Sequence, residues 1–370
     1  MLVLLALLGV ALLFAGLWLE HRTAVTLPVP TGPFATGRTT CAWVNPAAKR
    51  DVLAWIWYPV DRSSSAAPAE YLPYPWRMAL AQSSGRLMSQ FLTKDLGLVQ
   101  THSSPNSPIS TKQATYPVVI MRAGGGALTI DFTTLAENLA SHGYVVAGFD
   151  APYRTVVAVL PDGRVILRSR TATIKTLLSA WTEDTRFFVD QLDHLNGADS
   201  TGRFTGHLDM GRLGMLGYSF GGATALQFCH EDPRCKAGID IDGAPYGSVV
   251  KEGLTQPFLF LLSDHGDLSA PEARAVIGDI RSIYDRRPNG SLLLSIRGAN
   301  HFSFSDQMLV KNRIFIGLFQ LFQGGLDGRR GLAITDEYVH TFFDVYLKGA
   351  PAGLLDNLRK SYPEVQRITR

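Results

Sequence analysis

The segment Gly-Tyr-Ser-Phe-Gly at residues 217–221, followed by Gly222, contains the residue types of a catalytic serine turn. It lies between an apolar run over 213–216, which predicts a strand, and a predicted helix over 220–229. A nucleophile elbow needs such a strand-to-helix turn, in which small flanking residues let a serine occupy the strained apex with its hydroxyl exposed. Because the helix begins at the same point, its backbone N–H groups would face a developing oxyanion. We therefore expect Ser219 to be the nucleophile of an acyl-transfer reaction.

A serine hydroxyl is a weak nucleophile without a general base, so one of the nine histidines should serve it. His301 comes shortly after the last predicted strand, over 292–296, within Arg-Gly-Ala-Asn-His-Phe at 297–302. The chain order Ser, Asp, His places the base after such a strand. His265 also follows a strand and is the alternative, whereas the other histidines lie in linker, loop or helical segments. We expect His301 to be the general base.

The third group of such a site is a carboxylate that orients the histidine. Asp242 ends the predicted strand directly after the elbow helix, and Asp264 and Asp267 end the next strand. Asp150 also ends a strand, but it precedes the serine, against the order Ser, Asp, His. Asp240 lies inside an apolar strand and is expected to be a hydrogen-bonded structural carboxylate. Asp242 and Asp267 therefore stand as the two alternatives for the acid.

Backbone donors for an oxyanion are expected from two places. One is Phe220, which follows the nucleophile, and the other is the loop Gly124–Gly126, where glycines let a substrate approach the backbone closely. The glycine run lacks the Lys-Ser/Thr of a P-loop and the spacing of a dinucleotide fingerprint. We therefore expect no phosphate-binding loop, no cofactor and no metal.

Apolar runs and helical patterns alternate from residue 116 onward. The predicted strands cover 117–121, 144–149, 213–216, 237–241, 258–262 and 292–296, and the predicted helices cover 131–142, 173–195, 220–229, 313–322 and 337–347. Continuous apolar strands separated by helices predict an α/β fold with a mostly parallel central sheet covered by helices on both faces. Ligands gather at the carboxyl ends of strands in such sheets, which is where the candidate residues lie.

The chain before residue 116 is less regular. Residues 20–38 are proline-rich and predict an extended linker, so that a single catalytic domain would cover 39–370. Residues 52–58 are apolar and precede Pro59, which suits a strand near a sheet edge. The segment 76–97 predicts an amphipathic helix with one apolar face made by Met88, Phe91, Leu92 and Leu96.

Residues 1–19 form a separate apolar segment, in which no charged side chain occurs before Glu20. Eighteen helical residues span roughly 27 Å, about the thickness of the hydrocarbon core of a bilayer. A cleaved signal peptide is the alternative to an anchor, but the segment has no Lys or Arg at its start and no Ala-x-Ala site. We expect a membrane contact through residues 1–19 and a membrane-anchored or secreted, extracytoplasmic protein.

Composition excludes some classes of partner. The net charge of 370 residues is only +3, without a basic cluster, so nucleic acid is not expected. Cys41, Cys229 and Cys235 fit neither a disulfide framework nor a zinc site. Cys229 and Cys235 could form one bridge in an oxidising compartment, but we expect two inert thiols. The sequence does not indicate an oligomeric state.

Several motifs together resemble the secreted platelet-activating-factor acetylhydrolase family. The shared features are Ser-Phe-Gly-Gly-Ala-Thr at 219–224, Gly-Ile-x-x-Asp at 238–242 and Ile-Arg-Gly-x-x-His at 296–301. The resemblance extends from about Val52 to His301 and includes Tyr-Pro-Val-Val before the glycine loop. It implies an α/β-hydrolase fold and a calcium-independent serine esterase that removes short or oxidised acyl chains from phospholipids.

The resemblance also implies site residues. Ser219, Asp242 and His301 would form the triad, and Phe220 with Gly125 the oxyanion hole. The chain departs from the family at Tyr218, where a histidine is usual, at Ala123-Gly124, where the family has His-Gly, and at Gly243-Ala244-Pro245, where aromatic residues are expected. The base loop is also similar to that of bacterial cutinase-like polyester hydrolases, in which the acid would be Asp267. A polyester or general carboxylesterase is therefore the alternative function.

Overall fold

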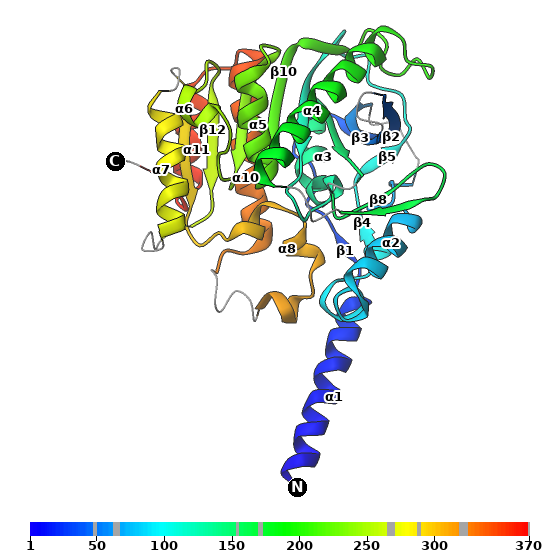
Figure 1. The fold of residues 1–370 in the computed structure, drawn as a ribbon. Helices are drawn as coiled ribbons and strands as arrows, with labels where there is room; N and C mark the ends of the chain where they lie inside the picture. Colours follow the sequence, from blue (N-terminus) through cyan, green and yellow to red (C-terminus); the bar gives the residue numbers. More distant parts are fainter. Residues whose placement is uncertain are drawn as a thin grey trace.

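The computed structural model describes residues 1–46, 50–61, 67–152, 155–168, 173–264, 271–286, 290–317 and 325–368. Within these residues the main feature is a ten-stranded sheet with the order β14-β13-β12-β11-β10-β6-β7-β3-β2-β5 (Figure 1). The strands from β13 to β7 run parallel, whereas β14, β3 and β2 each join the sheet by antiparallel pairing. The sheet strands are β2 (Ala35–Asn45), β3 (Arg50–Val60), β5 (Ser103–Pro105), β6 (Tyr116–Arg122), β7 (Val145–Asp150), β10 (Leu208–Tyr218), β11 (Cys235–Ile241), β12 (Phe258–Leu262), β13 (Leu292–Ile296) and β14 (Val365–Arg367).

Helices cover both faces of this sheet, as the alternation of apolar strands and helices predicts. Val119 and Met121 of β6 belong to the core beneath α3 (Thr133–Ser141) and α10 (Gly328–Lys348). Val118 and Ile120 belong to the opposite core, beneath α4 (Ile174–Gly197), α5 (Phe220–Glu231) and α7 (Pro271–Asp285). Alternate residues of a strand point to opposite faces, so a strand covered on both sides is apolar throughout.

Several short elements connect the strands and helices named so far. They are η2 (Leu96–Leu98), η3 (Thr129–Phe132), β8 (Val157–Val159), β9 (Val165–Leu167), α6 (Val249–Glu252), η4 (His301–Phe304), α8 (Gln307–Val310) and α11 (Gly353–Ser361). Of the predicted helix over 313–322, residues 313–317 are helical, and the others lie outside the described residues. Pro59 does not end its strand: β3 continues to Val60 and pairs with both β2 and β7.

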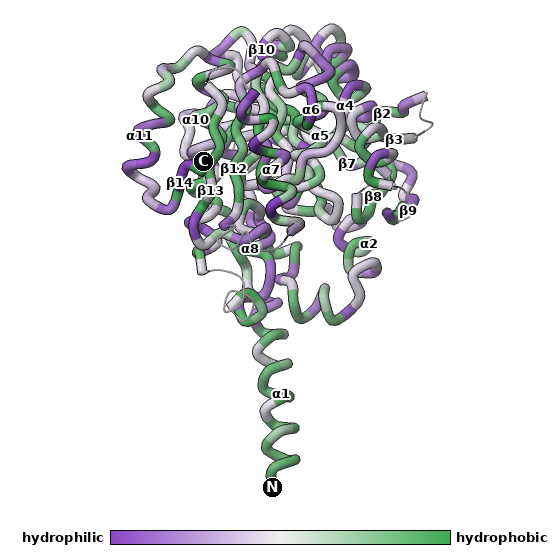
Figure 2. Tube along the Cα trace, turned by 60° about the vertical axis from the view of Figure 1, so that its left-hand side comes forward, coloured by the Kyte–Doolittle hydropathy of each residue, from purple (hydrophilic) through white to green (hydrophobic). Residues whose placement is uncertain are grey.

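The N-terminal helix α1 (Leu2–His21) projects from the body of the molecule and is apolar along its length (Figures 1 and 2). Its mean hydropathy is 2.7 over 18 residues, of which 6% are buried, so its length and composition would let it cross a membrane. The helix extends two residues beyond the predicted segment 1–19. The predicted linker 20–38 lies against the body, because β1 (Val25–Thr26) pairs with β4 (Val99–Gln100) and Leu27 is buried.

The single helix predicted over 76–97 is wrong. The chain forms α2 (Tyr74–Ser84), turns at Gly85 with φ +80°, and then makes one π-helical turn, η1 (Met88–Leu92). A positive φ is not helical, so the helix ends at this residue. Glycine occupies the position because it adopts positive φ at little cost. Thr93 is extended and forms a β-bridge with Lys311, which fixes the end of η1 against the body.

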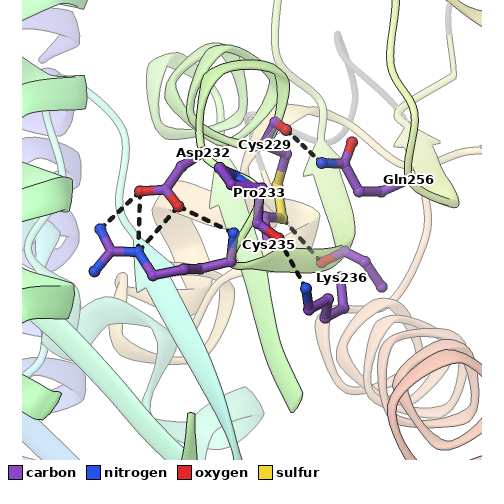
Figure 3. Close-up of a disulfide and its surroundings, with 8 residues drawn as sticks. Cys229, Asp232, Pro233, Cys235, Lys236 and Gln256 are labelled. Carbon is purple, nitrogen blue, oxygen red and sulfur yellow. Dashed lines mark hydrogen bonds and ion pairs between the residues drawn. A yellow bond between two sulfur atoms is a disulfide. The ribbon is translucent and has the colours of Figure 1, made fainter. Parts of the chain in front are cut away.

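Cys229 and Cys235 are joined by a disulfide, so the expectation of two free thiols is wrong. The bridge links the end of α5 to the first residue of β11, with a Cα–Cα distance of 5.1 Å (Figure 3). Gln256 donates a hydrogen bond of 2.6 Å to the carbonyl of Cys229. Because α5 begins at the predicted nucleophile and β11 leads to Asp242, the disulfide joins two elements that position the site. Cys41 is free.

Candidate active site

Ser219 occupies the turn between β10 and α5, with φ +56° and ψ −122°. Such a backbone is strained for a residue with a side chain and persists only where its surroundings enforce it. A Cβ at Gly217 would overlap the carbonyl of Gly221, and a Cβ at Gly221 would overlap the carbonyl of Arg122. The glycines on both sides are therefore required by the close approach of neighbouring backbone, as expected for a nucleophile elbow.

Asp242 and His301 are in direct contact. The carboxylate Oδ2 of Asp242 lies 2.6 Å from Nδ1 of His301. Its other oxygen, Oδ1, accepts hydrogen bonds of 2.8 Å from both the backbone N–H and the hydroxyl of Ser263. The side chain of Asp242 is 5% exposed and that of His301 42% exposed. The carboxylate is thus fixed by donors on one side and holds the imidazole on the other, with the histidine accessible to a substrate.

Both residues lie beside the elbow. The N–H of Ser219 donates to the carbonyl of Ile241, the residue before Asp242, at 2.8 Å. The ring of Tyr218 stacks on the imidazole of His301 with a centroid distance of 4.7 Å, and its hydroxyl donates to the carbonyl of His301 at 2.8 Å. The structure therefore joins Asp242 to His301 and places both beside the turn that carries Ser219.

The predicted oxyanion donors also border Ser219. A Cβ at Gly124 would lie 2.8 Å from the Cβ of Ser219, so the glycine loop passes directly over the nucleophile. In the described part of the chain, the N–H groups of Gly125 and Phe220 have no acceptor. Phe220 is the first residue of α5, where helical geometry leaves N–H groups without intrahelical partners. Both donors are thus available to a ligand.

A model of the family described as platelet-activating factor acetylhydrolase, isoform II, matches residues 20–156 and 183–350. The chain belongs to this family. Its members are carboxylic ester hydrolases, and the predicted resemblance is confirmed.

Individual relatives and a solved structure have the names of esterases or hydrolases. A probable 1-alkyl-2-acetylglycerophosphocholine esterase of Arthroderma benhamiae is 29% identical over 67% of this chain and 65% of its own length. A bis(hydroxyethyl) terephthalate hydrolase of Streptomyces coelicolor is 28% identical over 53% of this chain and 54% of its own length. The solved structure of a ferulic acid esterase from Streptomyces cinnamoneus covers 94% of this chain and 100% of its own, with 26% identity and a TM-score of 0.79. The α/β-hydrolase fold is thereby confirmed.

The competing carboxylates are placed differently. Asp264 accepts the N–H of Gly298 at 2.7 Å, and this contact closes the base loop rather than reaching the histidine ring. Asp150 accepts hydrogen bonds from Thr129 and Trp55, and burial raises the pKa of its carboxyl to about 6. Asp267 and the alternative base His265 lie outside the described residues.

Ser263, which donates to Asp242, has a role that the spacing alone does not indicate, whereas Asp240 is the buried, hydrogen-bonded carboxylate that the sequence predicts. Oδ1 of Asp240 accepts the N–H of Gly243 at 2.9 Å, while its Oδ2 has no partner in the described residues. Burial, followed by the charge of Asp242, raises the pKa of the Asp240 carboxyl well above its ordinary value. The raised pKa favours the neutral form of Asp240, which supports the turn behind Asp242 through its hydrogen bond to Gly243.

One group of side chains away from the site has the spacing of metal ligands. Ligand atoms of His142, His340 and Asp344 lie within 4.8 Å of one another. However, the Nε2 of His142 contacts the hydroxyl of Thr31 at 2.9 Å, and Asp344 is paired with Lys348 at 2.9 Å. The ammonium of Lys348 on the carboxylate of Asp344 would compete with a metal cation, and His142 is already bound to Thr31. We therefore do not assign a metal site to this group.

Proposed function

We propose that this chain is a serine esterase that removes short or oxidised acyl chains from phospholipids through an acyl-enzyme on Ser219. The observation that supports it most is the 2.6 Å contact between Asp242 and His301 beside the strained serine. A carboxylate on Nδ1 keeps the proton there, which leaves Nε2 free to accept the serine proton. Family membership and the similarity to a probable 1-alkyl-2-acetylglycerophosphocholine esterase support the substrate.

The proposed reaction has two steps. Nε2 of His301 takes the proton of Ser219 while Oγ attacks the acyl carbonyl, and the N–H groups of Gly125 and Phe220 stabilise the resulting oxyanion. The C–O bond to the glycerol oxygen breaks, and the imidazolium returns the proton to the departing alcohol. Water, activated by the same histidine, then cleaves the acyl-enzyme to the free acid.

Hydrolysis of aromatic or polyester substrates is the second candidate. Similarity to the terephthalate hydrolase and to the ferulic acid esterase favours it. Both candidates use the same triad, so the difference must lie in the walls of the binding site.

A panel of esters separates the candidates. We expect 1-alkyl-2-acetylglycerophosphocholine and p-nitrophenyl acetate and butyrate to be cleaved without calcium, and palmitoyl esters to be cleaved poorly. The Ser219→Ala variant should lose several orders of magnitude in kcat and its labelling by a fluorophosphonate probe. Faster cleavage of bis(hydroxyethyl) terephthalate than of any acetyl lipid would favour the second candidate, and near-normal turnover by Ser219→Ala would end the proposal.

The proposal includes α1 as an uncleaved membrane anchor on an extracytoplasmic protein. The ammonium of Lys94, whose side chain is 2% exposed, pairs with Glu20 at 2.6 Å and with the hydroxyl of Thr23 at 2.5 Å. The side-chain amide of Asn312 donates to the carbonyl of Leu17 at 3.0 Å. Removal of residues 1–22 would deprive Lys94 of Glu20, its carboxylate partner, which favours retention of the helix. The disulfide supports an oxidising compartment.

Membrane fractionation tests the anchor. The full-length chain should stay in the pellet through a carbonate wash, and a form that begins at Thr23 should be released from membranes. Accumulation of a shortened soluble form from the full-length gene would point to a cleaved signal peptide instead.

A further inference from the structure

A cavity of about 520 Å³ lies between the end of α1 and the glycine loop beside the nucleophile. His21, the last residue of α1, lines one side of it, and Gly126 lines the other. Gly124, which touches Ser219, is two residues from Gly126, so their Cα atoms are at most about 7.6 Å apart. The cavity therefore extends from the end of the apolar helix to the glycine loop that borders Ser219.

The cavity wall is mixed in character. Its apolar part comes from α2, η2, the segment before β8 and α8, and includes Met78, Leu80, Leu96, Val156 and Val310. Three cations, Arg77, Lys94 and Lys311, also lie on it. An apolar wall with a few charged groups suits an amphiphile better than a purely apolar or purely polar ligand.

Two of these cations already have carboxylate partners. Arg77 pairs with Glu70 at 3.4 Å, and Lys94 pairs with Glu20 at 2.6 Å. These pairs tie the wall to the chain around it, so neither charge depends on a ligand for compensation.

Lys311 differs from both. Its Nζ donates to the hydroxyl of Thr93 at 3.2 Å and lies 3.8 Å from the sulfur of Met88. Among the described residues, no carboxylate lies within ion-pair distance of it. The direct contacts of this partly buried ammonium are a hydroxyl and a thioether, and the carboxyl of Asp131 acts on it only over a longer distance. An anion would supply a direct charged partner.

Asp131 also lines the cavity and opposes an anion there. Its Oδ2 accepts the N–H of Leu128 at 2.9 Å and the amide of Gln307 at 3.3 Å. Burial raises the pKa of the Asp131 carboxyl, although the two donors and the charge of Lys311 lower it in part. Asp131 therefore has its own donors and does not form an ion pair with Lys311.

We propose that this cavity receives a phospholipid ester from the side of α1 and that Lys311 binds its phosphodiester, with the apolar wall against the lipid chain. The inference rests on the proposed function and adds the residue that recognises the headgroup. The phosphate would replace water on the ammonium, while the ester group extends past Gly126 toward Ser219. Lys311 thus determines preference for a phosphate-bearing lipid over a neutral one.

The test compares two acetyl lipids in the same nonionic micelles, using the full chain. One is 1-alkyl-2-acetylglycerophosphocholine, and the other is 1-alkyl-2-acetylglycerol, which has no phosphate. The measured quantity is the ratio of their kcat/KM values. We expect Lys311→Gln to lower this ratio about 10- to 100-fold, as for the loss of one charge-assisted hydrogen bond. Lys311→Arg should restore most of it, and the matched control Lys360→Gln, on α11, should leave it unchanged.

Each other outcome has a definite meaning. If Lys311→Gln lowers both kcat/KM values equally or changes neither, Lys311 does not read the phosphate and the inference is wrong. If millimolar inorganic phosphate inhibits hydrolysis of both lipids and Lys311→Gln abolishes the inhibition but leaves the kcat/KM ratio unchanged, the site serves the free anion, which also overturns the inference. If the wild type cleaves neither lipid but cleaves other esters, it is the proposed function that fails.

Discussion

The replacement Asp242→Asn tests the assignment of the acid most directly, because the surroundings of the carboxylate fix the outcome. Oδ1 accepts the backbone N–H of Ser263, and a backbone N–H cannot become an acceptor. The asparagine amide must therefore keep its oxygen toward Ser263 and present its NH₂ group to Nδ1 of His301. Nδ1 then has to accept, which moves the imidazole proton to Nε2, the position that should receive the proton of Ser219.

The expected loss follows from that tautomer. An amide in this position typically lowers kcat by about 10⁴-fold, which corresponds to about 5.4 kcal/mol of transition-state stabilisation. The opposite amide orientation would set the NH₂ group against the Ser263 donors and leave that buried N–H without an acceptor, at a cost of about 1–3 kcal/mol. In that orientation the amide oxygen faces Nδ1 and keeps the productive tautomer, so its minor population sets the residual activity of the variant, without the negative charge that stabilises the imidazolium.

The assay is hydrolysis of p-nitrophenyl butyrate across pH, with circular dichroism and thermal melting as checks of the fold. Asp264→Asn is the matched control, because Asp264 accepts from Gly298 instead of the histidine, and it should lose little. Asp267→Asn should also lose little. A crippled Asp267→Asn together with a nearly active Asp242→Asn would refute the assignment and favour the polyester-hydrolase pattern.

Three further perturbations have expected outcomes. Replacing Cys229 and Cys235 with alanine should lower the free energy of unfolding by about 2 kcal/mol in urea melts, since the bridge closes a short loop with a separation of six residues; an unchanged midpoint would show that the bridge does not form. Tyr218→Phe keeps the ring on His301 but removes a hydrogen bond, so kcat/KM should fall by up to about tenfold, and a 10³-fold loss would mean that the hydroxyl takes part in the chemistry. Burial raises the pKa of Asp306 to about 8, so the folded protein holds a proton that the unfolded chain releases near pH 4. The contribution of this proton to stability is therefore lost as pH rises from about 4 to 8, at about 1.4 kcal/mol per pH unit. Between pH 5 and 7 the unfolding free energy of the wild type should fall more steeply than that of Asp306→Asn. Parallel curves for the two proteins would contradict the raised pKa.

The sequence predicts the surroundings of Ser219 well because its signals are local. An apolar run, a glycine-flanked serine and a helical pattern follow one another within 213–229, and the structure places the elbow there. The chain order and the strand ends then favour His301 over the alternative His265, and the structure places His301 against Asp242. The catalytic roles themselves remain predictions until the variants are measured.

Contacts between segments far apart in the sequence could not be predicted in the same way. The two donors of Ser263 reach Asp242 only because β12 lies next to β11 in the sheet. Likewise, the spacing of Cys229 and Cys235 allows both free thiols and a bridge. Whether the bridge forms depends on how closely the end of α5 approaches the start of β11, which is a property of helix-on-sheet packing.

The break in the helix predicted over 76–97 bears directly on the proposed function. Its residues have helical spacing, but the turn at Gly85 separates α2 from η1 and lets Phe91 contact Phe14 of α1 edge-to-face, at 5.2 Å. The same break places Met88 on the cavity wall beside Lys311. A continuous helix would satisfy the local pattern but would leave neither the contact with α1 nor this wall. Local sequence patterns tend to be overridden at functional sites, so the break at Gly85 supports the proposed lipid entrance between α1 and Ser219.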